Sequence, residues 1–252
     1  MFAPSWPLTL LTLALCLLFA RLGQWQWQRG EYAQTQRAAF LAGGGPAQPL
    51  AGQATGDLPR FAHVTVSGTL DGAHQFLLDN RSHAGLPGYE VLTPLHLTDG
   101  RTLLVDRGWI AFTGSRARLP SITLDPGTPD PAIPDAGPDA APGDGLQISG
   151  RLDGLPVAGL ALGHAPPPLS GDWPRLTSFP TLEELAASLG SPIEPRILLL
   201  DATAPGGLLR DWQPPGMPPE RHWSYALQWW GFAVTLVVIW FIMNTRPARE
   251  SP

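Results

Sequence analysis

The stretch WSYALQWWGFAVTLVVIWFIM, residues 223–243, decides the architecture because it carries no charged side chain over its whole length. A helix rises about 1.5 Å per residue, so roughly 20 apolar residues cross the hydrocarbon core of a bilayer. A second uncharged stretch, FAPSWPLTLLTLALCLLFA, covers residues 2–20 and stops at Arg21. The sequence therefore predicts two transmembrane helices, and if both cross the bilayer, the two termini share one side of it.

These two segments divide the chain into four parts. We expect an N-terminal transmembrane helix over residues 1–21, a soluble domain over 22–221, a C-terminal transmembrane helix over 222–244 and a short tail over 245–252. The soluble part is long enough to bury a core of its own. The arginines that follow each span favour opposite orientations, and long loops cross a membrane largely regardless of charge. Charge counting therefore leaves the orientation open.

Composition excludes several classes of function. The formal net charge of −5 and the absence of a basic run argue against a nucleic-acid partner. Cys16 is the only cysteine, so neither an intrachain disulfide nor a CxxC redox pair can form. Leu15 is too large for the position before a lipoprotein cleavage site. A cleaved signal peptide has a basic region before its apolar run, and no basic residue precedes the run here. We therefore interpret the first segment as a retained anchor and Cys16 as a small buried or lipid-facing residue.

Helix signals are few in the soluble part. Residues 21–41 are expected to continue as a helix beyond the membrane, with Trp25 in the interfacial aromatic belt. Thr181 and Glu184 have the spacing of a capping box and predict a second helix over residues 181–189. Gly190, which follows directly, can end that helix because glycine adopts the left-handed conformation without cost.

Most of the remaining pattern predicts strands. Alternating or continuous apolar runs are bounded by glycine, proline and aspartate, and Asp99-Gly100 is a strong hairpin signal. Residues 122–146 are dominated by proline, aspartate and glycine, which predicts a flexible insertion. The predicted fold class is thus an α+β membrane protein, in which two transmembrane helices flank one mainly β domain with one or two helices. Strands are expected over residues 62–70, 75–79, 89–97, 102–110, 146–152 and 196–200.

The sequence carries no enzyme signature: it has no GxSxG, no phosphate-binding glycine loop, no HExxH and no CxxC pair. Six histidines are scattered without metal-ligand spacing. His222 differs from the others because it lies at the start of the second span, on one helical stripe with Ala226, Trp229 and Ala233 and beside Tyr225. A flat ring or another helix could approach this stripe closely. A neutral imidazole can ligate haem iron, but an interfacial histidine needs no ligand at all.

A second group of candidate residues is expected on adjacent strands. Arg81 and Arg107 are surrounded there by aromatic and turn residues. One interpretation is structural: Arg107 pairs with an acid of the same sheet, such as Asp79 or Asp106. The other is functional: the two arginines contact an anion, for instance the propionates of a haem, or a partner protein.

At these residues the chain resembles the surfeit-locus protein family, also called Shy-type, whose members are membrane assembly factors for cytochrome c oxidase. Asp106 stands where asparagine is common in the family. Four blocks carry the resemblance in order: LGQWQ at 22–26 with Arg29 resembles LGxWQxxR; NR at 80–81, GY at 88–89 and TPL at 93–95 resemble a central block; LVDRGWI at 104–110 resembles LVNRGW; and HWSYALQW at 222–229 resembles HxxYAxQW.

The resemblance implies a role and a location. It implies assembly of an aa3-type oxidase through insertion or stabilisation of haem a in subunit I, with subunit I and the haem a synthase as partners. It also implies a bacterial inner-membrane protein whose soluble domain lies in the periplasm and whose termini are cytoplasmic. His222 is then the expected haem iron ligand, flanked by Tyr225 and Trp229. Expected partner or anion contacts are Trp25, Arg29, Arg81, Arg107 and Trp109.

Two hypotheses of different class follow. In the first, the protein handles haem a and binds it transiently through His222. In the second, it binds no haem and holds subunit I, or subunit I with the haem a synthase, through the small-residue stripe and the β domain. In both hypotheses the protein is an assembly factor and not an enzyme.

Overall fold

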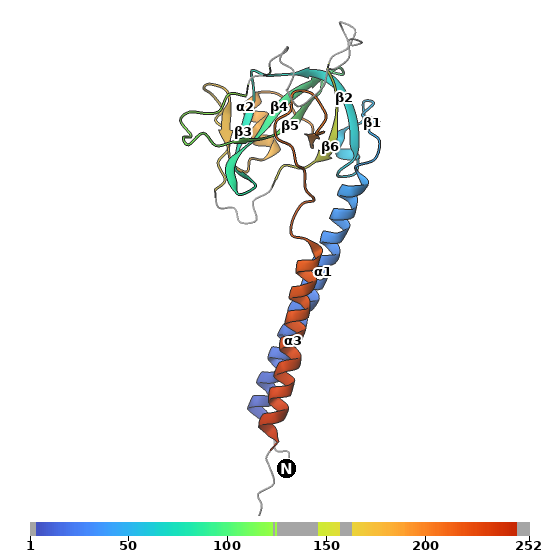
Figure 1. Cartoon of the computed structure of the whole chain (residues 1–252), viewed down its shortest axis with the longest axis vertical. Coiled ribbons are helices and arrows are strands. Elements are labelled where there is room, and N and C mark those ends of the chain that lie inside the picture. Colours follow the sequence, from blue (N-terminus) through green and yellow to red (C-terminus); the bar gives the residue numbers. More distant parts are fainter. Residues whose placement is uncertain (1–3, 123, 125–145, 157–162, 246–252) are drawn as a thin grey trace, which may run out of the picture. The chain divides into compact units, whose positions relative to one another are not determined.

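The computed structural model describes residues 4–122, 124, 146–156 and 163–245 (Figure 1). The chain divides into two compact units, one formed by residues 42–213 and the other by the segments on either side of them. Residues 22–41 therefore group with the terminal helices, although the boundaries expected from the sequence placed them with the β domain. Nearly all of the predicted insertion 122–146 and of the predicted tail 245–252 lie outside the described residues.

The β unit, residues 42–213, is built on one sheet that closes on itself. Its strand order is β1-β2-β6-β8-β5-β4-β3-β7, and β2 also pairs with β4. Five strands, β2, β6, β8, β5 and β4, therefore form a closed ring. The remaining strands extend the sheet beyond the ring, and the outermost two, β1 and β7, contain two and three residues. The strands are β1 Gln48–Pro49, β2 His63–Leu70, β3 Phe76–His83, β4 Leu86–Leu97, β5 Thr102–Ala111, β6 Leu146–Asp153, β7 Arg175–Thr177 and β8 Ile197–Leu200.

The interior of the ring is an apolar core. Side chains alternate along each strand, so every second residue points inward, and β2 shows this with buried Val64 and Val66 between half-buried neighbours. Leu95 and Val105 meet them from β4 and β5 with no exposed surface. This core explains why the apolar alternation of 62–70 predicted a strand with one buried face.

A second core lies on the outer face of the sheet, under helix α2, Leu182–Leu189. Leu185 of this helix is fully buried and belongs to one cluster with Leu92 and Leu104 of β4 and β5. Because both faces of β5 are covered, its residues from Thr102 to Gly108 are buried without interruption. The predicted capping box is present: Thr181 and Glu184 exchange side-chain and backbone hydrogen bonds, and Gly190 ends the helix with φ 78°.

Strand predictions were confirmed except at bulges and edges. The Asp99-Gly100 hairpin joins β4 to β5, with Gly100 at φ +87°. Strand β3 runs on to His83, four residues further than expected. Its register against β4 shifts between Leu78 and Arg81. Asn80 adopts φ 60° at this bulge. A bulge places an extra residue that breaks the apolar alternation, so the alternating pattern stops before the strand does.

The helical unit consists of α1, Trp6–Ala42, and α3, Pro219–Asn244. A 3₁₀ turn, Thr55–Asp57, and the short α2 complete the helices of the described chain. Both terminal helices are long and apolar enough to cross a membrane. At about 1.5 Å per residue, the 37 residues of α1 extend well beyond a hydrocarbon core of about 30 Å. The predicted fold class, two apolar helices flanking a mainly β domain, is confirmed.

The two terminal helices are antiparallel and lie side by side (Figure 1), and their contacts run from Thr9 and Trp240 to Gly30 and Trp223. On α1 the contacts recur every seven residues, at Thr9, Cys16, Gly23 and Gly30, which is the spacing of a coiled coil. Trp240 donates to Thr9 Oγ1 at 3.0 Å, and the Cys16 thiol lies 3.6 Å from the Ala233 carbonyl oxygen. The stripe containing Ala226 and Ala233 therefore faces α1, and Ala226 has no exposed surface. The sequence analysis left open whether a flat ring or another helix approaches this stripe, and in the structure helix α1 covers it.

Candidate functional site

His222 lies in the first turn of α3, three residues after Pro219, where the proline is tolerated because its missing N–H would have no partner. Its ring is partly exposed. Nδ1 lies 2.9 Å from Oε1 of Gln26 on α1. No residue in the described part of the chain hydrogen-bonds Nε2. The ring is thus held at one nitrogen and open at the other.

The two expected flanking aromatics take different positions. Tyr225 is 44% exposed. Trp229 is stacked on Phe19 of α1, with ring centroids 5.7 Å apart and an interplanar angle of 29°. Of these two aromatics, Tyr225 is therefore the more exposed, whereas Trp229 joins the two helices.

Trp25 and Arg29 are neighbours one turn apart on α1. The Arg29 guanidinium carbon lies 5.8 Å from the centroid of the Trp25 ring, and 51% of Trp25 is exposed. Both belong to the helical unit, as does His222. This part of the helix pair therefore presents an exposed cation and an exposed indole, which suits the expected contact with an anion or a partner.

The sequence left two interpretations of Arg107: a contact with an anion or partner, or an ion pair with Asp79 or Asp106. The expected ion pair is wrong. Its guanidinium donates to Gln75 Oε1 at 2.8 Å, to the Gly206 carbonyl at 2.6 Å and to the Ile122 carbonyl at 3.3 Å. Asp79 instead accepts from Arg116. Arg107 is only 3% exposed, and burial, together with the charge of Arg210, lowers its pKa to about 10. This arginine holds three chain segments together inside the β unit.

Gln75 is the residue that makes this arrangement possible, and the sequence did not single it out. It is 2% exposed, and its amide oxygen accepts from both Arg107 and Thr93. Its amide nitrogen donates to the carbonyls of Gly72 and Ile122. A glutamine before an apolar strand carries no local signal of such a role, because all of its partners except Gly72 are distant in sequence.

Arg81 forms an ion pair with Glu90, with Nε 2.9 Å from Oε2, although the angle falls outside hydrogen-bond geometry. Asp106 lies beside this pair and is 1% exposed, with its Oδ1 accepting from the Gly108 amide. Burial raises the pKa of Asp106 well above its usual range, and the nearby charge of Glu90 adds to this effect. Burial also raises the pKa of Glu90, against the opposing charge of Arg81. Burial and the charge of Glu90 therefore both favour the neutral form of the Asp106 carboxyl.

Trp109 packs at the β3–β4–β5 corner. Its indole lies 5.5 Å from the His83 ring, and a Cβ on Gly88 would overlap it. Within the described residues, its buried Nε1 has no hydrogen-bond partner. Arg81, Arg107 and Trp109 thus lie on neighbouring strands, but Arg107 donates to Gln75 and Arg81 pairs with Glu90. The structure does not gather the three side chains around one point.

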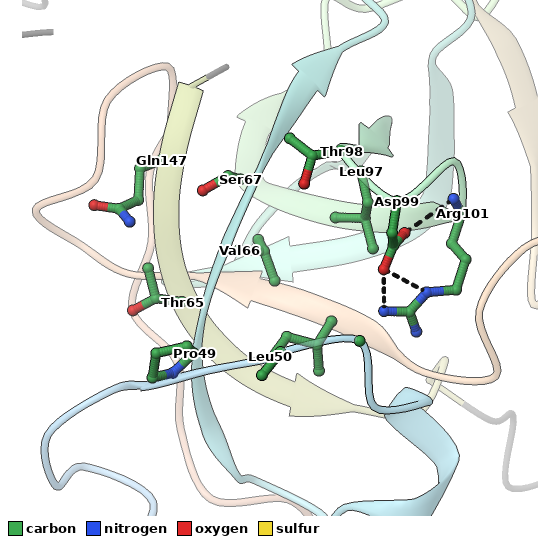
Figure 2. Close-up of a pocket in the computed structure, with 12 residues that line it drawn as sticks. Pro49, Leu50, Thr65, Val66, Ser67, Leu97, Thr98, Asp99, Arg101 and Gln147 are labelled. Atoms are coloured by element: carbon green, nitrogen blue, oxygen red, sulfur yellow. Dashed lines mark hydrogen bonds and ion pairs between the residues drawn. The ribbon is translucent and has the colours of Figure 1, made fainter. Parts of the chain in front are cut away.

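One pocket of about 270 Å³ opens beside β1 and β2 (Figure 2). Among its described lining residues, Arg101 is the single cation, and Asp99 accepts from it at 2.6 Å. Glu194 accepts from the same guanidinium at 3.1 Å. Since both carboxylates contact this arginine, the pocket offers no unpaired positive charge to an anionic ligand. None of the expected site residues lines it.

Metal ligands are not clustered in the part of the chain that the structure describes. No group of three or more histidine, cysteine, aspartate or glutamate side chains is placed to hold an ion there.

Comparison with known proteins gives a match that spans both units. A family model described as SURF1 family matches residues 13–234. A SURF1-like protein of Dictyostelium discoideum is 41% identical over 64 residues, which are 25% of this chain and 24% of that protein. In that match the chain spans about a quarter of the relative's length. The region matched by the family model includes Gln26, the β unit and His222.

Proposed function

Because the chain belongs to the SURF1 family, we propose that it is an assembly factor, and not a catalyst, for an aa3-type cytochrome c oxidase. In this proposal it assists the insertion of haem a into subunit I, or the stabilisation of haem a there. Its partners are subunit I and, as a second partner, the haem a synthase. The haem is cargo for the oxidase, so residues of this chain need only hold and release it.

One observation carries the proposal: His222 presents Nε2 without a hydrogen-bond partner in the described chain, while Nδ1 is held by Gln26. A histidine ligates haem iron through a ring nitrogen that carries a lone pair. One protein ligand on a helix surface forms a bond that a second protein can displace, which suits transfer. Tyr225, with 44% of its surface exposed, is the residue that would flank the porphyrin.

Location is part of the same proposal. Both terminal helices have the length and composition of membrane spans, so His222 would stand at the membrane edge, where α3 begins. The apolar tail of haem a could then lie in lipid. We place the β unit in the periplasm of a bacterium, with both termini in the cytoplasm.

A second function is favoured by the packing of α3. The small-residue stripe of Ala226 and Ala233 is already covered by α1. Trp229 is likewise engaged with Phe19. This arrangement suits a scaffold that binds no haem and holds subunit I, or the haem a synthase, through other surfaces of the helix pair and the β unit.

One purification separates the two functions. The full chain is isolated from cells that synthesise haem a, and its absorbance is recorded in the Soret region. Haem handling predicts a haem a band that His222→Ala abolishes and that His83→Ala, a histidine of the β unit, leaves intact. The scaffold predicts no band in any variant, with subunit I still co-purifying with His222→Ala.

A further inference from the structure

Gln26 is the neighbour of His222 across the helix pair, with its Oε1 2.9 Å from Nδ1. We propose that Gln26 is a positioning residue: its amide oxygen holds the proton on Nδ1 and so leaves Nε2 as the ligand nitrogen. This inference rests on the proposed function, because it names what orients the haem ligand. The hydrogen bond itself can be tested without haem.

The chemistry of imidazole makes the choice of partner decisive. A neutral imidazole carries one proton, so one ring nitrogen donates while the other accepts or binds a metal. An amide oxygen can only accept, so Nδ1 must carry the proton when Oε1 faces it. Nε2 then has the lone pair. A hydrogen-bond acceptor on the far nitrogen fixes the tautomer and the ring orientation of a metal-binding histidine.

Packing on both sides of Gln26 keeps the two side chains at this distance. Three residues earlier, Gly23 lies against the indole of Trp230, and four residues later, Gly30 lies against that of Trp223. Any Cβ at either glycine would overlap the tryptophan. Trp27 contacts both indoles, with centroids 6.0 Å from Trp223 and 5.8 Å from Trp230. The register of α1 against α3 is therefore set on both sides of the pair.

A neutral acceptor also suits a histidine that must release its cargo. A carboxylate at position 26 would raise the basicity of the imidazole more than an amide does, and a more basic imidazole binds iron more tightly. The amide gives orientation with a smaller gain in ligand strength. Two properties of His222, its tautomer and its affinity, are thus assigned to one side chain on the other helix.

The tautomer is measured directly in the full chain without haem. The protein is labelled with ¹⁵N-histidine in detergent micelles, at a pH where the imidazoles are neutral, and His222→Ala identifies the resonances of residue 222. The wild type should show protonated Nδ1 and unprotonated Nε2. Gln26→Leu should shift the population toward protonated Nε2, whereas Gln28→Leu, an exposed glutamine of the same helix, should not. An unchanged tautomer in Gln26→Leu overturns the proposal.

Haem a titration tests the consequence. Gln26→Leu should weaken binding of haem a by about 10–100-fold, as loss of such a partner does at other metal sites. Gln26→Glu should restore binding and shift the Soret band and the reduction potential, which a purely structural role would not do. Equal affinity in wild type and Gln26→Leu, with binding lost in His222→Ala, contradicts the role of Gln26 alone. If the wild type binds no haem a, the ligand role of His222 fails together with the proposed haem handling. The tautomer measurement then still shows whether Gln26 orients the His222 ring, because it needs no haem.

Discussion

Gly30 of α1 lies directly against the indole of Trp223 on α3, so that a Cβ on residue 30 would overlap the ring. Gly23 stands in the same relation to Trp230. Glycines that allow close approach are a common device of helix pairs in membranes. Here each glycine accommodates a large aromatic ring, which determines how far the helices can slide past each other.

Gly30→Leu should separate the helices near His222. Overpacking of this kind costs about 1–3 kcal/mol. The matched control is Gly231→Leu, because a Cβ there meets no atom within 4 Å. Helix pairing can be followed in Ala233→Cys, because the backbone carbonyl of residue 233 lies 3.6 Å from the Cys16 thiol. Oxidation should protect both thiols from maleimide in this background, and adding Gly30→Leu should reduce the protection. Equal protection with Gly30→Leu and Gly231→Leu would show that this close approach does not hold the pair.

Asp106→Asn should stabilise the protein at neutral pH. The folded-state pKa of Asp106 is raised by burial, so the folded protein holds this proton more tightly than the unfolded chain does. Stability is then fully present below the unfolded value near 3.8 and falls as pH rises toward the folded pKa. An asparagine keeps an oxygen for the Gly108 amide and cannot ionise.

The measurement is urea unfolding of both proteins from pH 4 to pH 8, in detergent micelles. Wild type should lose stability through this range, and Asp106→Asn should be flatter and more stable at the upper end. The exposed Asp172→Asn serves as a control. A parallel decline in wild type and Asp106→Asn would mean that this carboxyl does not carry the pH dependence.

Arg107→Met should destabilise the β unit by about 2–4 kcal/mol, because it removes charged hydrogen bonds to buried acceptors. A double-mutant cycle with Gln75→Leu should give strong coupling, since the two side chains are 2.8 Å apart. Arg118→Met, at an exposed position, should change the free energy of unfolding little. Additive effects of the two buried changes would remove the basis for treating Arg107 and Gln75 as one unit.

Thr181→Ala should cost about 1 kcal/mol, the usual loss when an N-cap side chain is removed. The Thr181 hydroxyl accepts from the Glu184 amide at 3.2 Å. Thr181→Ser retains that acceptor and should be close to wild type. Because α2 covers the outer core through Leu185, hydrogen exchange of its amides should accelerate in the alanine variant. Unchanged exchange would show that packing alone holds this helix.

Local signals predicted the fold well where one face of an element is buried. The uncharged spans, the capping box at Thr181 and the hairpin at Gly100 each depend on neighbouring residues, and each was found where expected. Closure of the ring through β2 and β4 depends on residues far apart in sequence, such as Gly68 and Leu97. No local pattern carries that pairing, so the barrel could not be predicted.

The candidate site was harder to predict for the same reason. His222 was identified from its own surroundings, but its partner Gln26 lies 196 residues away. Helical periodicity grouped His222 with Ala226 and Trp229, yet it could not say that α1 would cover that stripe. For Arg107, charge suggested an acidic partner, while the structure satisfies it with an amide and two carbonyls. Amide and carbonyl acceptors are neutral, so a search of the sequence for opposite charges does not find them.

The outer strands of the sheet have a further consequence for a protein confined to a membrane plane. β1 and β7 offer only two and three residues to a neighbouring chain, whereas long unpaired edges template aggregation. Among the described residues, these two outermost strands therefore offer a neighbouring copy little backbone on which to add a strand.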